Sequence, residues 1–220
     1  MQLLCLPTEI ILSIADELPS SQDVLYFSLA NKALFHSLLP VAYHFNVRHE
    51  HSSALHWAIQ SGKLELVRSL IERFHADVNA EHRGKSPIFL AIEHRSKDIV
   101  ALLLSQEKIN FQTHDRGGIT PLLYAASRGS SSTVQALINK HHAELNAQDK
   151  KGRNALWYTV YHGLRKATQK ICQAGGNMNM YDQDRLSPLH LAIEKIDIRM
   201  VKILLDHCKN TLQTPAFRVQ

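Results

Sequence analysis

The chain has 220 residues, of which 45% are hydrophobic and 20% are charged, and this composition excludes a disordered chain because it supplies a sizeable core. Its net charge of +5 is well below the excess expected of a dedicated nucleic-acid binder. The three cysteines, Cys5, Cys172 and Cys208, have no CxxC spacing, which argues against a disulfide framework or a cysteine zinc site and favours a reducing compartment.

The first twenty residues are apolar but do not have the pattern of a signal peptide. They lack a basic start, and Pro7, Glu9, Asp16 and Glu17 interrupt or follow the apolar run. No stretch approaches the roughly 18 uninterrupted apolar residues that a membrane-spanning helix needs. We therefore expect a cytoplasmic or nuclear protein without a membrane partner.

Residues 1–47 predict three short helices. The first has apolar residues at helical spacing, at Ile10, Ile11, Ile14 and Leu18. The second follows the hydroxyl and acidic residues of 20–23, which suit a helix N-terminus. The third covers 33–39 and ends at Pro40.

This order resembles the F-box, whose pattern begins Leu-Pro-x-Glu-Ile and continues through an Asp-Leu pair to a Lys and an aromatic residue. The matching positions are Leu6, Pro7, Glu9, Ile10, Asp23-Val24, Lys32 and Phe35. The resemblance implies docking on the Skp adaptor of a cullin ubiquitin ligase. It implies that the buried contacts are Leu6, Pro7, Ile10, Ile11, Ile14 and Leu25, with Glu9 and Asp23 at the rim. Alternatively, residues 1–47 only cap the hydrophobic end of the repeats that follow.

A five-fold repeat fills most of residues 48–220. A small residue, then Pro or Ala, then an aliphatic residue recurs with its aliphatic position at Leu55, Ile88, Leu122, Leu156 and Leu189, in steps of 33 or 34 residues. Three residues later comes an alanine column, and twelve residues later a valine column followed by aliphatic pairs. These spacings predict two helices per repeat, with repeats near 50–80, 81–113, 115–147, 149–181 and 182–210. Polar turns around Gly84, Gly118 and Gly152 predict exposed hairpin tips.

The repeat resembles the ankyrin repeat, whose signature is TPLHxA. The matches are clearest at 54–58, 120–122 and 187–192, and the period agrees. The resemblance implies an all-α solenoid of five helix-turn-helix repeats. Repeat four departs from it at Asn154, Thr159 and Thr168, and we expect its buried hydroxyls to be unpaired and the repeat to open first. Repeat five has Arg185 in place of the usual turn glycine.

The charge is concentrated in the repeats, because residues 1–52 carry −3 and residues 53–220 carry +8. In ankyrin proteins the hairpin tips and inner helices usually form the binding surface. The resemblance places on that surface Arg83, Lys85, Arg116, Arg128, Lys150, Lys151 and Arg153, together with Tyr161 and His162. Such a cluster favours an acidic protein segment as partner. The alternative is a solvated surface that keeps the solenoid soluble.

No motif predicts an enzyme. His56 and His190 occupy the histidine position of TPLH, and the remaining histidines form no HExxH motif. Phosphate-binding loops and the GxSxG elbow are also lacking. We expect no cofactor and no metal, and the sparse aromatic residues argue against nucleic acid. Trp57 and Trp157 are expected to pack within the stack.

The F-box resemblance therefore implies that the chain selects targets for a ubiquitin ligase. The alternative function is an ankyrin scaffold or regulator whose N-terminal helices only cap the solenoid.

Overall fold

The computed structural model describes residues 53–82, 84–115, 117–139 and 143–212. The predicted F-box-like segment, with all its adaptor contacts, lies outside these ranges. The described residues form ten α-helices and one isolated antiparallel bridge, between His82 and Lys85. The all-α prediction is therefore confirmed for this part of the chain. None of its helices has both the length and the apolar content that crossing a membrane requires.

The chain divides into two compact units, Met1–His94 and Arg95–Gln220. In the first unit, α4 (Ser53–Gln60) packs against α5 (Leu64–Glu72) and α6 (Pro87–Glu93). The buried His56 donates from Nε2 to the carbonyl oxygen of Lys85 at 3.0 Å, which ties α4 to the hairpin before α6. This histidine therefore has the intramolecular hydrogen-bonding role expected of the TPLH position.

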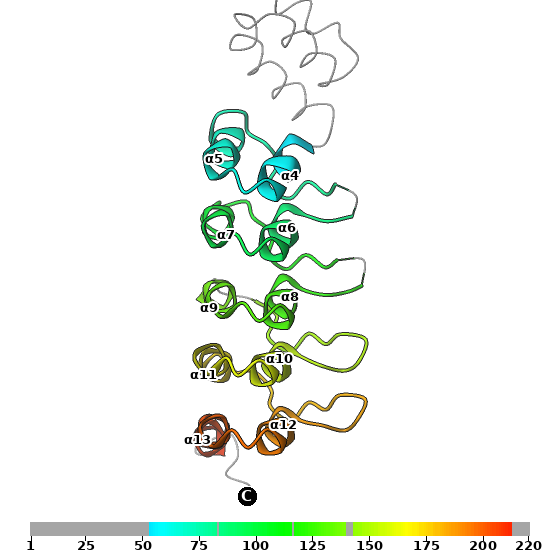
Figure 1. Ribbon diagram of the computed structural model, residues 1–220, viewed down its shortest axis with the longest axis vertical. Helices are drawn as coiled ribbons and strands as arrows, with labels where there is room; N and C mark the ends of the chain where they lie inside the picture. The colour runs from blue at the N-terminus through cyan, green and yellow to red at the C-terminus, as the bar shows by residue number, and fades with distance from the viewer. Residues whose placement is uncertain (1–52, 83, 116, 140–142, 213–220) are drawn as a thin grey trace, which may run out of the picture. The chain divides into compact units, whose positions relative to one another are not determined.

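The second unit is built from two rows of stacked helices (Figure 1). The inner row contains α8 (Pro121–Ser127), α10 (Ala155–Tyr161) and α12 (Pro188–Glu194). The outer row contains α7 (Lys97–Leu104), α9 (Ser131–Asn139), α11 (Arg165–Gln173) and α13 (Ile198–Leu212). Each helix contacts the next member of its row, so the predicted stacking in sequence order is confirmed within this unit.

The inner helices begin where the repeated small residue predicts. Thr120 Oγ1 accepts a hydrogen bond from the backbone N–H of Leu123 at 3.2 Å, and Pro121 occupies the first turn. Ser187 and His190 form a reciprocal capping box at the start of α12. These contacts satisfy N–H groups that a helix start leaves without partners.

Repeat four contradicts one expectation. Thr159 and Thr168 are fully buried, but Thr159 Oγ1 donates to the carbonyl oxygen of Leu156 at 3.0 Å. Thr168 Oγ1 in turn donates to Thr159 Oγ1 at 3.0 Å. The prediction of unpaired hydroxyls was therefore wrong, because the two departures from the repeat pattern face each other and satisfy one another.

Repeat five departs from its predicted core. Met200 and Leu204 are fully buried, whereas Val201 is only half-buried and Leu205 is exposed. Within the described residues no helix pair packs beyond α12 and α13.

Neighbouring hairpins of the second unit approach closely at Gly152. This residue has φ 78°, and a Cβ there would lie 2.9 Å from the carbonyl oxygen of Tyr181. Both facts require glycine. Arg185 takes the corresponding left-handed conformation in the next hairpin, at φ 60°.

Candidate protein-interaction surface

Each hairpin of the second unit is organised by an aspartate seven residues before the aliphatic anchor. Asp149 shows the pattern: its N–H donates to the carbonyl oxygen of Arg153 at 3.0 Å, and its Oδ1 accepts from the backbone N–H groups of Lys151 and Arg153. Asp115 and Asp182 repeat it. Sequence reasoning missed these residues, although their constant spacing from the anchors was a usable signal.

Asp149 also binds two side chains. Its Oδ2 accepts from Arg153 Nε at 2.9 Å, from Arg153 Nη2 at 2.6 Å and from Tyr158 Oη at 2.8 Å. Burial alone would raise the pKa of Asp149, but the hydrogen bonds from Arg153, Tyr158 and Lys151 outweigh it and lower that pKa. Burial and the carboxylate raise the pKa of Tyr158 to about 12. The cluster therefore holds a charged carboxylate and a neutral phenol.

An aromatic stack continues from this cluster toward solvent. The Arg153 guanidinium lies 5.3 Å from the ring centroid of Trp157 and 4.8 Å from that of Tyr158. Trp157 stacks on Tyr161 with centroids 5.3 Å apart and an interplanar angle of 12°. Trp157 is 8% exposed and Tyr161 is 48% exposed. The buried indole N–H of Trp157 has no hydrogen-bond partner among the described residues, which is an exception for a buried polar group.

Cations gather where the inner helices end. Lys195 Nζ lies 4.4 Å from the ring centroid of Tyr161, and His162 Nε2 donates to the carbonyl oxygen of Ser127 at 2.9 Å. Arg128, His162 and Lys195 are exposed and stand six residues after their respective anchors. Sequence reasoning named the first two and missed Lys195, which the same spacing would have found.

The remaining predicted residues differ in whether their side chains are exposed or bound to other residues of the chain. Lys150 and Lys151 are exposed at a hairpin tip, where their carbonyl oxygens accept from Gln183 Nε2 and N at 2.9 Å each. Arg153 is committed to Asp149 and to the aromatic rings, so it supports the hairpin instead of offering a free cation. Arg83 and Arg116 lie outside the described residues. We call the exposed set in the second unit the basic-aromatic surface: Arg128, Lys150, Lys151, Tyr161, His162 and Lys195.

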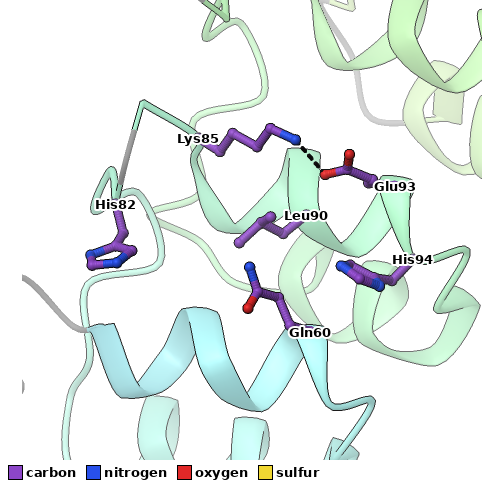
Figure 2. A pocket seen from close by; sticks show the side chains of 6 residues that line it. All are labelled: Gln60, His82, Lys85, Leu90, Glu93 and His94. Atoms are coloured by element: carbon purple, nitrogen blue, oxygen red, sulfur yellow. Dashed lines mark hydrogen bonds and ion pairs between the residues drawn. The ribbon is translucent and has the colours of Figure 1, made fainter.

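The first unit has a separate hollow of about 430 Å³ between its hairpin, α4 and α6 (Figure 2). Gln60 and Leu90 lie between His82 on the hairpin side and His94 at the end of α6. Lys85 forms an ion pair with Glu93, so its charge is compensated. Trp57, expected to be packed, is instead half-exposed, with Lys63 Nζ 4.4 Å from the centroid of its ring.

These side chains offer charge, aromatic surface and hydrogen-bonding groups. Among the described residues, no group of three or more His, Cys, Asp or Glu is arranged to hold a metal ion. The basic-aromatic surface combines fixed aromatic rings with exposed cations. Such a surface binds other molecules through stacking, cation–π contacts and charge.

Comparison with known proteins agrees with this architecture. A family model described as ankyrin repeats in three copies matches residues 25–115 and 108–182. Rabankyrin-5 of Mus musculus is 32% identical over 154 residues, which is 69% of this chain and 13% of that protein. Regulatory protein NPR5 of Arabidopsis thaliana is 43% identical over 75 residues, or 33% of this chain and 15% of that protein. The chain thus spans only a small part of the length of these relatives.

Proposed function

The chain belongs to the ankyrin-repeat family, and from that premise we propose that its basic-aromatic surface binds an acidic, extended segment of a protein partner. Ankyrin repeats act as protein–protein interaction modules. Four of the six residues of this surface are Arg or Lys, and a cluster of one sign steers and aligns a partner of the opposite sign.

The observation that carries this proposal is the anchoring of Tyr161. One contact of its ring is the buried Trp157, and another is the ammonium group of Lys195. A half-exposed tyrosine fixed in this way loses little side-chain entropy on binding, and Tyr, Trp and Arg dominate binding energy at protein interfaces. The corresponding position of α8 holds Ser127 and that of α12 holds Glu194, so the feature belongs to one repeat and is not imposed by the fold.

The experiment is a quantitative affinity purification from cells, with mass spectrometry, of the full chain and of a Tyr161→Ala/Lys195→Glu variant. We expect the variant to lose its most enriched partners by at least tenfold, while a Lys166→Glu control keeps them. Lys166 is an exposed lysine of the outer helix α11, so its substitution changes the net charge by the same amount away from the surface. Equal recovery by the wild type and the double variant, with unchanged thermal melts, would contradict the proposal.

We further propose that the chain is the target-selecting subunit of a Skp-cullin-F-box ubiquitin ligase. The support is the Leu6-Pro7-x-Glu9-Ile10 pattern and the residues that follow it. In this role residues 1–47 hold the adaptor and the repeats hold the target, so the chain performs no chemistry itself.

The adaptor role is tested by a pull-down of the full chain with a Skp-type protein, beside a thermal melt. We expect Ile10→Asp or Ile11→Asp to abolish adaptor binding and leave the main unfolding transition in place. A charge in such an interface loses its hydration without gaining a partner. Failure of the wild-type chain to associate, or loss of the whole transition in the variants, would assign residues 1–47 to capping.

A further inference from the structure

Four large apolar side chains are exposed on α12, α13 and the turn that joins them. The exposed fractions are 57% for Ile193, 81% for Ile196, 77% for Ile198 and 42% for Leu205. Three of them fall within six consecutive residues, and Leu205 lies two turns after Ile198 along α13. We call these four residues the isoleucine face.

Part of this face continues the interface between successive helix layers of the second unit. The position of Ile193 is held by Ala126 in α8 and Val160 in α10, which are 0% and 2% exposed. The position of Leu205 is held by the buried Cys172 in α11. Ile193 and Leu205 thus occupy positions that are buried in the preceding layers. In the described part of the chain, both are exposed.

The other two isoleucines are not required by the repeat. At the position of Ile196 the preceding layers have Gly129 and Gly163, and at that of Ile198 they have Ser131 and Arg165. Ile196 also has φ 55°, a left-handed conformation that is strained for a β-branched residue. Since its side chain is almost fully exposed, no burial within the described residues offsets this strain. Such conformations cluster at functional sites, but Arg95 also has φ 55° at the same turn position of an earlier repeat, so the unusual feature here is the exposed isoleucine side chain.

We propose that the isoleucine face is the docking site for a second copy of this chain, in a two-fold symmetric dimer. The charged residues next to the four apolar residues are Glu194, Lys195, Asp197, Arg199, Lys202 and Asp206, three of each sign. In an isologous contact each group meets a copy of its own surface, so a balanced rim can pair with itself. The basic-aromatic surface, which has an excess of cations, would repel its own copy.

The immediate neighbours of Ile196 leave the face clear. Lys195 lies over the ring of Tyr161, and the carboxylate of Asp197 accepts from Arg165 Nη2 at 2.9 Å and from the backbone N–H of Met200 at 3.1 Å. Both side chains are therefore engaged within the second unit. The dimer would leave Tyr161 and the hairpin tips free, so two copies of the basic-aromatic surface would act on one partner with increased avidity.

Sedimentation velocity of the full chain from about 1 to 100 µM tests this proposal. We expect a concentration-dependent dimer in the wild type and a dissociation constant at least tenfold higher in Ile198→Asp, as expected for a charge at the centre of an apolar contact. Tyr181→Asp, which alters an exposed aromatic residue of a hairpin, is the control and should dimerise as the wild type does.

Ile196→Gly separates an effect on docking from an effect on folding, because the stability of the dimer and the melting temperature should change in opposite directions. Glycine relieves the left-handed strain, so the melting temperature should rise, whereas loss of the side chain should weaken the dimer. A wild-type chain that stays monomeric over the whole range overturns the proposal. Slow hydrogen exchange of 196–205 in such a monomer, made fast by Phe217→Asp, would assign the face to residues 213–220 and equally overturn it. Neither outcome alters the partner capture expected of the basic-aromatic surface.

Discussion

Two successive helix pairs of the second unit, α8/α9 and α10/α11, occupy equivalent places with different interiors. The first buries Ala125 and Val134 where the second buries Thr159 and Thr168. The polar pair is tolerated because its hydroxyls bond to each other and to a backbone carbonyl. The buried positions of the repeat thus accept small side chains whose polar atoms are all hydrogen-bonded. An apolar side chain meets this condition because it has no polar atoms.

The same two pairs differ in how their inner helices start. Thr120 caps α8 with one hydrogen bond, whereas Asn154 caps α10 at Trp157 N and also donates from Nδ2 to the carbonyl oxygen of Asn177 at 3.0 Å. Asn154 therefore joins the helix start to the loop after α11. The helix pair with the polar interior is also the pair that carries Trp157 and Tyr161.

We expect the largest difference in unfolding free energy between the two helix pairs when these capping residues are replaced. Asn154→Ala should lower the free energy of unfolding by about 2 to 3 kcal/mol, since it removes the cap and a buried hydrogen bond. Thr120→Ala removes only the cap and should cost about 1 kcal/mol. Urea unfolding of both variants measures the gap. Equal losses would mean that the bond to Asn177 contributes nothing.

The threonine pair should show strong coupling. Thr159→Val leaves the buried Thr168 hydroxyl without its acceptor and should cost about 1 to 2 kcal/mol. Adding Thr168→Val removes that hydroxyl and should restore most of the loss, because both positions are then apolar, as they are in α8/α9. A double-mutant cycle of unfolding free energies checks this, and additive losses would show that the two hydroxyls do not depend on each other.

Replacing Asp149 should cause a smaller loss of unfolding free energy, and this loss should depend on pH. Its pKa is lowered in the folded chain, so its contribution is complete above the ordinary value of 3.8 and is lost as the pH falls through the lower folded value. Asp149→Asn should therefore cost about 1 kcal/mol at neutral pH. The unfolding free energy of the variant should approach that of the wild type as the pH falls below 3.8. A gap that persists undiminished in acid would exclude a role for the carboxylate charge.

Features that depend on the repeat pattern could be predicted from the sequence, whereas contacts between particular side chains could not. Period and column agreement predicted the helix pairs and their order, because each repeat packs mainly on its neighbours. The bond between Thr159 and Thr168 could not be predicted from column matching, since it depends on side-chain direction across two helices. Likewise, the sequence marked Arg153 as a cation but did not show that Asp149 holds it. Lys195 was within reach of the spacing argument, since it stands six residues after Leu189 as Arg128 and His162 stand after their anchors, and it was missed.

Peptide-display selection against the full chain tests whether the basic-aromatic surface recognises an acidic protein segment. We expect enrichment of peptides rich in Asp and Glu. Their binding should weaken at least tenfold in Arg128→Glu/Lys195→Glu and in Tyr161→Ala, and should be preserved in Lys166→Glu. Selection of peptides without acidic enrichment, or binding that survives those substitutions, would contradict it.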